Sequence, residues 1–220
     1  MIRLHHSSQT RSMRSLWLLY ELGLEFELIT HDFGAVLQEP AYRAINNASR
    51  VPTLEIDGQV VRESGAIAQV LCERAPESGL GRAVGHAEWA KWLDWIHFAE
   101  TISVHVASLT QQHIFIFDDS MRSPTVMKVE AKRLSRTIQS VDQALAGQDY
   151  LLPSGFSAAD VGVGQAIYMG QHFAALDPYP HVTAWFDRIS ARPAFQKSLP
   201  GPGEGLYQKP FYAPWTDPAT

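Results

Sequence analysis

A short stretch of alternating residues constrains the fold of this chain more than any other feature. Apolar and acidic residues alternate through residues 54–57, which is the pattern of a strand with one buried face. The pair Asp57-Gly58 favours the type I′ turn that joins two antiparallel strands. Residues 53–61 are therefore predicted to form a β-hairpin.

Two dipeptides flank this hairpin, Val51-Pro52 before it and Glu63-Ser64 after it. A cis bond before Pro52 would turn the Val51 N–H and C=O outward to pair with an extended peptide, whereas a trans proline would simply open the strand. Ser64 is expected to cap the next helix, whose N-terminus attracts a carboxylate. Glu63 could bind an ammonium group, so the two flanks together would recognise an α-amino acid zwitterion. An ordinary serine cap beside a first-turn acid is the alternative.

The residues around the hairpin predict a βαβ unit. Strands are expected over residues 2–5 and 25–30, and between them the leucines of residues 12–22 recur at helical spacing. Gly23 is placed to end that helix. A short helix over residues 40–44 comes next, and another follows the hairpin. The first part of the chain therefore has the order βαβ, α, ββα.

Glycines and prolines gather in residues 76–85, and most of the chain beyond them has helical periodicity. Helices are expected over residues 86–109, over residues 126–146, from residue 157 onward, and over residues 181–190. We predict a first domain over residues 1–77, a linker over residues 78–86 and an all-helical domain over residues 87–220 with an irregular, proline-rich tail. The fold class is α/β followed by all-α.

Composition excludes several classes of partner. The 220 residues carry a net charge of -5 with a pI near 6.0, so the chain has no bulk attraction to nucleic acid or to an anionic membrane. No run of eighteen apolar residues is present to cross a bilayer, and the N-terminus lacks the apolar core of a signal peptide. Cys72 is the one cysteine, which rules out a disulfide within the chain. We expect a cytoplasmic protein without nucleic-acid or membrane partners.

The order of elements, with Val-Pro before the hairpin and Glu-Ser after it, resembles the cytosolic glutathione transferases over most of the chain. The segment Phe-Ser-Ala-Ala-Asp at residues 156–160 adds a capping-box pattern that in this family folds the core helix of the second domain. Asp160 is therefore assigned to folding. The resemblance implies a thioredoxin-like first domain, a helical second domain, glutathione as co-substrate, no metal, and a homodimer.

The resemblance also implies a set of glutathione-binding residues. In the family, the residue before a cis proline pairs with the cysteinyl backbone of glutathione, and the Glu-Ser pair holds its γ-glutamyl end. A basic residue beside the Val-Pro pair and a residue just before the second helix lie near the glycyl end. In this chain the corresponding residues are Val51, Pro52, Glu63, Ser64, Arg50 and Gln38.

Glutathione chemistry needs a thiolate, and a hydroxyl donor beside a helix N-terminus would lower the thiol pKa from about 8.5. Residues 10–19, which begin Thr-Arg-Ser, resemble a bacterial and fungal subgroup that has Ser-Arg-Ser at this point. Thr10 then falls where Ser-type members place their hydroxyl, and Ser12 is the second candidate; the alternative is that either residue merely caps the helix. The loop after the first strand has no cysteine, which argues against mixed-disulfide chemistry, and Cys72 is expected to be a buried apolar residue.

The predicted function is conjugation of the glutathione thiolate to small apolar electrophiles, a detoxification reaction. A glutathione-dependent disulfide reductase or peroxidase and a non-catalytic glutathione-binding module are the alternatives. The helical domain is expected to supply the apolar site, where His97, Glu100 and His105 line the cleft or, with poorer spacing, hold a metal. Aromatic residues of the tail either cover that pocket or dock on the domain surface: Tyr207, Phe211, Tyr212 and Trp215.

Overall fold

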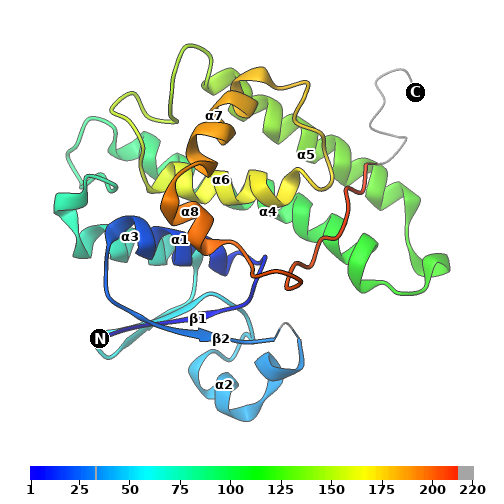
Figure 1. Cartoon of the computed structure of the whole chain (residues 1–220), viewed down its shortest axis with the longest axis horizontal. Coiled ribbons are helices and arrows are strands. Elements are labelled where there is room, and N and C mark those ends of the chain that lie inside the picture. The colour runs from blue at the N-terminus through cyan, green and yellow to red at the C-terminus, as the bar shows by residue number, and fades with distance from the viewer. Residues whose placement is uncertain (33, 213–220) are drawn as a thin grey trace. The chain divides into compact units, whose positions relative to one another are not determined.

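The computed structural model describes residues 1–32 and 34–212 of the chain (Figure 1). The chain forms two compact units, each with its own packed interior. The first unit comprises Met1–Trp92 and Ser190–Leu206, and the second comprises Leu93–Ile189 and the chain from Tyr207 onward. The domain and linker boundaries drawn from the sequence stay a prediction, because a unit defined by packing can collect segments that are distant along the chain.

A four-stranded sheet forms the centre of the first unit. Its strands are β1 (Ile2–His6), β2 (Glu27–Thr30), β3 (Thr53–Ile56) and β4 (Gln59–Val61). They lie in the order β2-β1-β3-β4, with β2 parallel to β1 and the hairpin strands antiparallel to their neighbours. Leu4 lies at the centre, paired with Leu28 on one side and Leu54 on the other. The predicted βαβ unit and hairpin are both confirmed.

The first unit also contains helices, and some of them cover the two faces of the sheet. The helical elements are α1 (Ser12–Leu22), η1 (Ala35–Gln38), α2 (Pro40–Ile45), α3 (Ser64–Arg74), η2 (Pro76–Ser78) and α8 (Pro193–Ser198). Figure 1 shows α1 and α3 on one face and α2 on the other. Gly23 ends α1 in the left-handed conformation, with φ of 63°, as its position predicts.

Helix α8 packs on α1 although about 170 residues separate them along the chain. The Trp17 and Phe195 rings meet edge to face with centroids 4.9 Å apart. The Arg192 guanidinium donates two hydrogen bonds of 2.7 Å to the Glu21 carboxylate. Aromatic burial and a bidentate ion pair therefore join α8 to the first unit, an association that the sequence pattern does not predict.

The start of α3 differs from the expectation. The hairpin turn has φ of 49° at Asp57 and 80° at Gly58, as a type I′ turn requires. Glu63 is the N-cap of α3, however, and Ser64 is its first helical residue, so the prediction of Ser64 as the cap is wrong. The Ser64 hydroxyl instead accepts a hydrogen bond of 3.1 Å from the guanidinium of buried Arg14, a cation that needs an acceptor once it leaves water.

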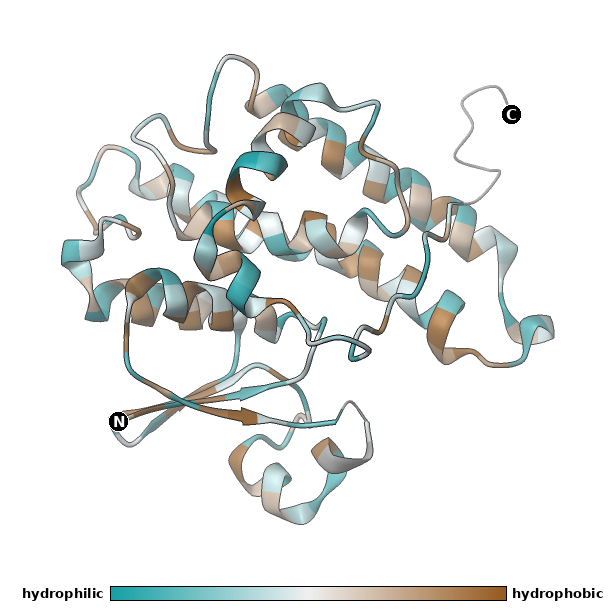
Figure 2. Cartoon of the chain, in the orientation of Figure 1, coloured by the Kyte–Doolittle hydropathy of each residue, from teal (hydrophilic) through white to brown (hydrophobic). Residues whose placement is uncertain are grey.

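The second unit is helical. Its elements are α4 (Trp89–Thr110, whose first turn belongs to the first unit), η3 (Gln111–Phe115, a π-helical turn), η4 (Asp119–Met121), α5 (Pro124–Ala144), α6 (Ala158–Gly170) and α7 (Pro180–Ser190). Figure 2 shows hydrophobic and hydrophilic residues alternating along α5, whose buried residues recur every three to four positions. In the described part of the chain no helix combines the length and apolarity needed to cross a membrane.

A capping box begins α6, as the sequence predicts. The Ser157 hydroxyl accepts from the Ala159 N–H at 3.2 Å, and Asp160 accepts from the Ser157 N–H at 2.9 Å. The fully buried Asp160 carboxylate also accepts from Leu151 N–H at 3.0 Å and from the Trp185 indole at 2.9 Å. Asp160 therefore joins three segments of the second unit, which confirms its assignment to folding.

Candidate active site

The main chain around Val51 is held in place by hydrogen bonds to the preceding residue. The Val51-Pro52 bond is cis. The carbonyl of the preceding residue, Arg50, accepts hydrogen bonds from the Tyr42 hydroxyl at 2.6 Å and the Asn46 amide at 2.9 Å. Within residues 1–32 and 34–212, no group hydrogen-bonds to the N–H or C=O of Val51. This peptide unit is therefore positioned to pair with an extended ligand.

The register of the hairpin brings both flanking dipeptides to one place. Leu54 pairs with Val61, so the chain just before β3 and the chain just after β4 lie at the same open end of the hairpin. Glu63 is exposed there, at the N-terminus of α3. Arg14, reaching over from α1, adds a positive charge beside Ser64. The arrangement offers a main-chain edge, a helix N-terminus with a buried cation, and a carboxylate.

A cluster of hydroxyl groups lies where β1 leads into α1. The Ser12 hydroxyl is fully buried and lies 2.7 Å from the Thr10 hydroxyl and 2.7 Å from Nδ1 of His6. It also accepts from the Ser7 N–H at 3.1 Å. Thr10 is partly exposed, donates to the Ser7 carbonyl at 2.8 Å, and accepts from the Ser12 N–H at 3.2 Å. Of the two candidate hydroxyls, Thr10 is therefore the more accessible.

Sequence analysis did not single out His6 as a site residue. Residues two apart in a strand face the same side, so His6 shares the side of buried Leu4 and points toward α1. Burial lowers the pKa of His6 to about 4, and its imidazole is neutral at pH 7. The alternation of side-chain direction along a strand, which places His6 on the same face as apolar Ile2 and Leu4, was the available signal for this position.

His5 faces the opposite side of the sheet and belongs to a different network. Its Nε2 lies 3.0 Å from the Glu55 carboxylate and its Nδ1 lies 2.9 Å from His31. Burial and the proximity of His5 lower the pKa of His31, while hydrogen bonding from His5, opposed by partial desolvation, lowers that of Glu55. This network ties the end of β2 to β1 and β3.

Two predicted glycyl-end residues are exposed. Gln38 ends η1, and Arg50 directly precedes Val51, with its carbonyl held by Tyr42 and Asn46. Over the described ranges, neither side chain has a hydrogen-bond or ion-pair partner within the protein, and their roles stay predictions. Cys72 is buried, as expected, and burial raises the pKa of its thiol to about 12.

The histidines and glutamate predicted on α4 do not converge. His105 Nδ1 pairs with the Glu130 carboxylate of α5 at 2.7 Å, whereas His97 is exposed. Among the residues with described positions, no three or more His, Cys, Asp or Glu side chains are grouped to hold a metal ion.

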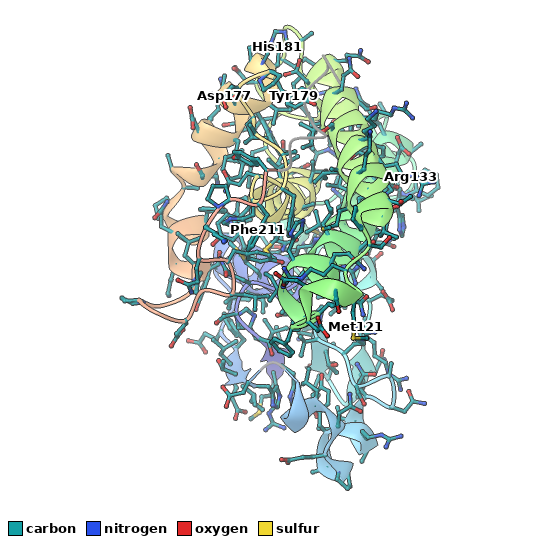
Figure 3. All side chains as sticks on the ribbon, turned by 90° about the vertical axis from the view of Figure 1, so that its right-hand side faces the viewer. Met121, Arg133, Asp177, Tyr179, His181 and Phe211 are labelled. Carbon is teal, nitrogen blue, oxygen red and sulfur yellow. The ribbon has the colours of Figure 1, made fainter. Side chains whose placement is uncertain are left out.

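The described part of the tail docks on the second unit. Tyr207 stacks on His172 with centroids 4.6 Å apart, and its hydroxyl lies 2.8 Å from that of Thr110. The Phe211 ring, labelled in Figure 3, packs on Phe173 and the ring of His113 in the π-helical turn. Trp215, also predicted to contribute, lies outside the described residues.

Comparison with known proteins agrees with this architecture. A model of the glutathione S-transferase N-terminal domain matches residues 4–79, and one of the C-terminal domain matches residues 106–193. The chain is 32% identical to a glutathione S-transferase of Silene vulgaris, over 90% of this chain and 96% of that protein. It is 29% identical to glutathione S-transferase 3 of Schizosaccharomyces pombe, over 88% and 85% of the two chains.

A solved structure extends the agreement to three dimensions. The glutathione S-transferase of a sphingomonad, complexed with glutathione, superposes with a TM-score of 0.77 at 26% identity, covering 93% of this chain and 99% of that one. The fold is thus a thioredoxin-like domain followed by a helical bundle, the architecture of a glutathione-dependent enzyme. The chain belongs to the glutathione S-transferase family and is a glutathione S-transferase-like enzyme.

Proposed function

We propose that this enzyme conjugates the glutathione thiolate to small apolar electrophiles. The observation that carries the proposal is the open end of the hairpin, where the N-terminus of α3 lies beside the Val51 main chain, which has no hydrogen-bond partner among the described residues. Val51 pairs with the cysteinyl residue of glutathione. Glu63 binds the γ-glutamyl ammonium, and Ser64 with the first α3 amides binds the neighbouring carboxylate. Arg50 and Gln38 attract the glycyl carboxylate.

Thr10 donates its hydroxyl proton to the glutathione sulfur and stabilises the thiolate. Its partial exposure at the start of α1 supports this role over the buried Ser12 hydroxyl, which is enclosed by His6, Ser7 and Thr10. The rate enhancement then comes from a lowered thiol pKa and from holding the thiolate beside the electrophile, with no covalent enzyme intermediate.

Substitution of Thr10 tests this assignment. We expect Thr10→Ala to lower kcat/KM for a model aryl halide about a hundredfold, because one donor to the developing anion is lost. Thr10→Ser, which retains the hydroxyl, should stay within about threefold of the wild type. An unchanged rate in Thr10→Ala, or an equal loss in both variants, would remove Thr10 from the mechanism.

The same preparations separate the alternative functions. Reduction of a glutathione mixed disulfide, measured beside aryl halide conjugation, would reveal a reductase. The loop after β1 has no cysteine to form an enzyme-bound mixed disulfide, so we expect conjugation to dominate. Binding of glutathione by calorimetry without either turnover would identify a binding module.

We further propose a detoxifying role, a cytoplasmic location and a homodimer. The acidic composition and the family membership support them. Sedimentation equilibrium measures the assembly directly, and a dimer requires twice the chain mass of 24.5 kDa.

A further inference from the structure

The buried imidazole of His6 lies behind the two hydroxyls discussed above and has no part in the chemistry proposed so far. Its Nδ1 lies 2.7 Å from the Ser12 hydroxyl, which lies 2.7 Å from the Thr10 hydroxyl, which in turn lies 2.8 Å from the Ser7 carbonyl. These three contacts form a line that runs from buried His6 through Ser12 to the partly exposed Thr10 and then to the carbonyl of buried Ser7. Each is short enough to require a hydrogen between its two heavy atoms.

Counting protons over these three short contacts assigns a direction to each of them. The Ser7 carbonyl can only accept, so the proton in the last contact belongs to Thr10. The Ser12 hydroxyl has two acceptors within reach, the Thr10 hydroxyl at 2.7 Å and the Ser7 carbonyl at 3.1 Å, and we assign its proton to the shorter contact with Thr10. Both hydroxyl protons are then assigned. The hydrogen in the contact between the Ser12 hydroxyl and His6 therefore comes from an N–H at Nδ1 of His6.

We propose that His6 is a positioning residue whose Nδ1–H sets this direction, so that Thr10 presents its proton to the glutathione sulfur. The inference rests on the proposed function. With His6 donating, the Ser12 hydroxyl accepts from two groups, His6 and the Ser7 N–H, and its own proton goes to Thr10 at 2.7 Å in preference to the Ser7 carbonyl at 3.1 Å. When a thiol binds, the Thr10 proton turns from the Ser7 carbonyl to the sulfur, and the thiol proton passes to solvent.

The opposite tautomer of His6 would reverse the direction of the hydrogen bond between His6 and Ser12. A bare Nδ1 would accept the Ser12 proton, and Thr10 would then have to donate either to Ser12 or to the Ser7 carbonyl. One short oxygen–oxygen contact would be left without a hydrogen in either case. Burial keeps His6 neutral, so a single ring proton decides between the two arrangements. Donors arranged in series also strengthen one another, which makes Thr10 a better donor to the thiolate.

Two substitutions of His6 test the proposal. His6→Asn can place an amide N–H near the position of Nδ1, whereas His6→Leu fills the space without a donor. We expect His6→Leu to raise the pKa of bound glutathione by about one unit and to lower kcat/KM at pH 7 about tenfold. His6→Asn should stay close to the wild type in both quantities.

The thiolate absorbance of the protein–glutathione complex, followed against pH, measures the thiol pKa. S-methylglutathione affinity should be unchanged in both variants because that ligand forms no thiolate.

An equal thiol pKa in His6→Leu and the wild type would overturn the proposal. The ring proton can also be observed without any substitution, by nitrogen NMR of the labelled wild-type enzyme, and a bare Nδ1 would overturn the proposal even if a variant failed to fold. The outcome is distinct from that of the proposed function. A wild-type enzyme that neither binds nor turns over glutathione contradicts both, whereas a fully active His6→Leu enzyme with a normal thiol pKa contradicts only the role of His6.

Discussion

Burial of a single imidazole couples the stability of the first unit to pH. The pKa of His6 is lowered from 6.5 to about 4 by desolvation, so the unfolded chain binds a proton more tightly than the folded chain does. The contribution of neutral His6 is complete above pH 6.5 and is lost progressively as the pH falls toward 4. At pH 4.5 the loss from this residue amounts to about 2 to 3 kcal/mol.

Urea unfolding at pH 7.5 and pH 4.5 checks this prediction. The wild type should lose more stability between the two pH values than His6→Asn does, and the difference should approach the 2 to 3 kcal/mol estimated from the pKa shift. Identical losses in the two proteins would show that His6 is not buried as a neutral group.

How far a residue could be placed from sequence depends on whether its partners are local. The Val51-Pro52 and Glu63-Ser64 pairs are adjacent to a hairpin whose turn residues can be recognised, so their meeting at one end was predictable. His6 was not, because its environment comes from a helix that folds back over β1. Ser64 was misassigned as a cap for the same reason, since its partner Arg14 lies fifty residues away.

At the scale of elements, Asp160 accepts hydrogen bonds from two segments outside the α6 cap as well as from the cap itself. Its carboxylate accepts from Ser157, Leu151 and Trp185, and an asparagine would replace one of its two acceptor oxygens by a donor. We expect Asp160→Asn to destabilise the second unit by about 2 to 4 kcal/mol, because buried donors lose their acceptor. Asp177→Asn, at a more exposed position in the loop before α7, is the matched control and should change the unfolding free energy by less than about 0.5 kcal/mol. A comparable loss in both variants would contradict this role.

Helix ends were predictable where a cap lies at the boundary. The expected α1 agrees with the structure at both ends, and the start of α6 follows its capping box. The expected start of α5 was two residues late, because Ser123 caps the helix and Pro124 occupies its first turn. Helix α8 was not delimited from sequence, since six residues carry too little periodicity and its stability comes from packing on α1.

At the scale of the whole molecule, the sequence predicted an α/β unit followed by helices, and the family comparison confirms both. The sequence did not predict that residues 190–206 belong to the first unit. That assignment depends on a salt bridge and a ring contact between segments far apart in the chain, and no local pattern encodes such a pair.

Ligand-linked stability tests the proposed binding site in the intact enzyme. At a glutathione concentration of about a hundred times Kd, the wild type should gain about 2.7 kcal/mol against unfolding. Glu63→Gln removes the charge proposed to bind the γ-glutamyl ammonium, so we expect affinity to fall about tenfold and the gain at the same concentration to fall to about 1.4 kcal/mol. Glu63 is exposed, and stability without ligand should therefore be unchanged. Glu77→Gln, an exposed acid of the same unit, should keep the full gain. Equal ligand-induced gains in all three proteins would show that the open end of the hairpin does not bind the γ-glutamyl group, because a carboxylate that contacts the ligand cannot lose its charge without effect on affinity.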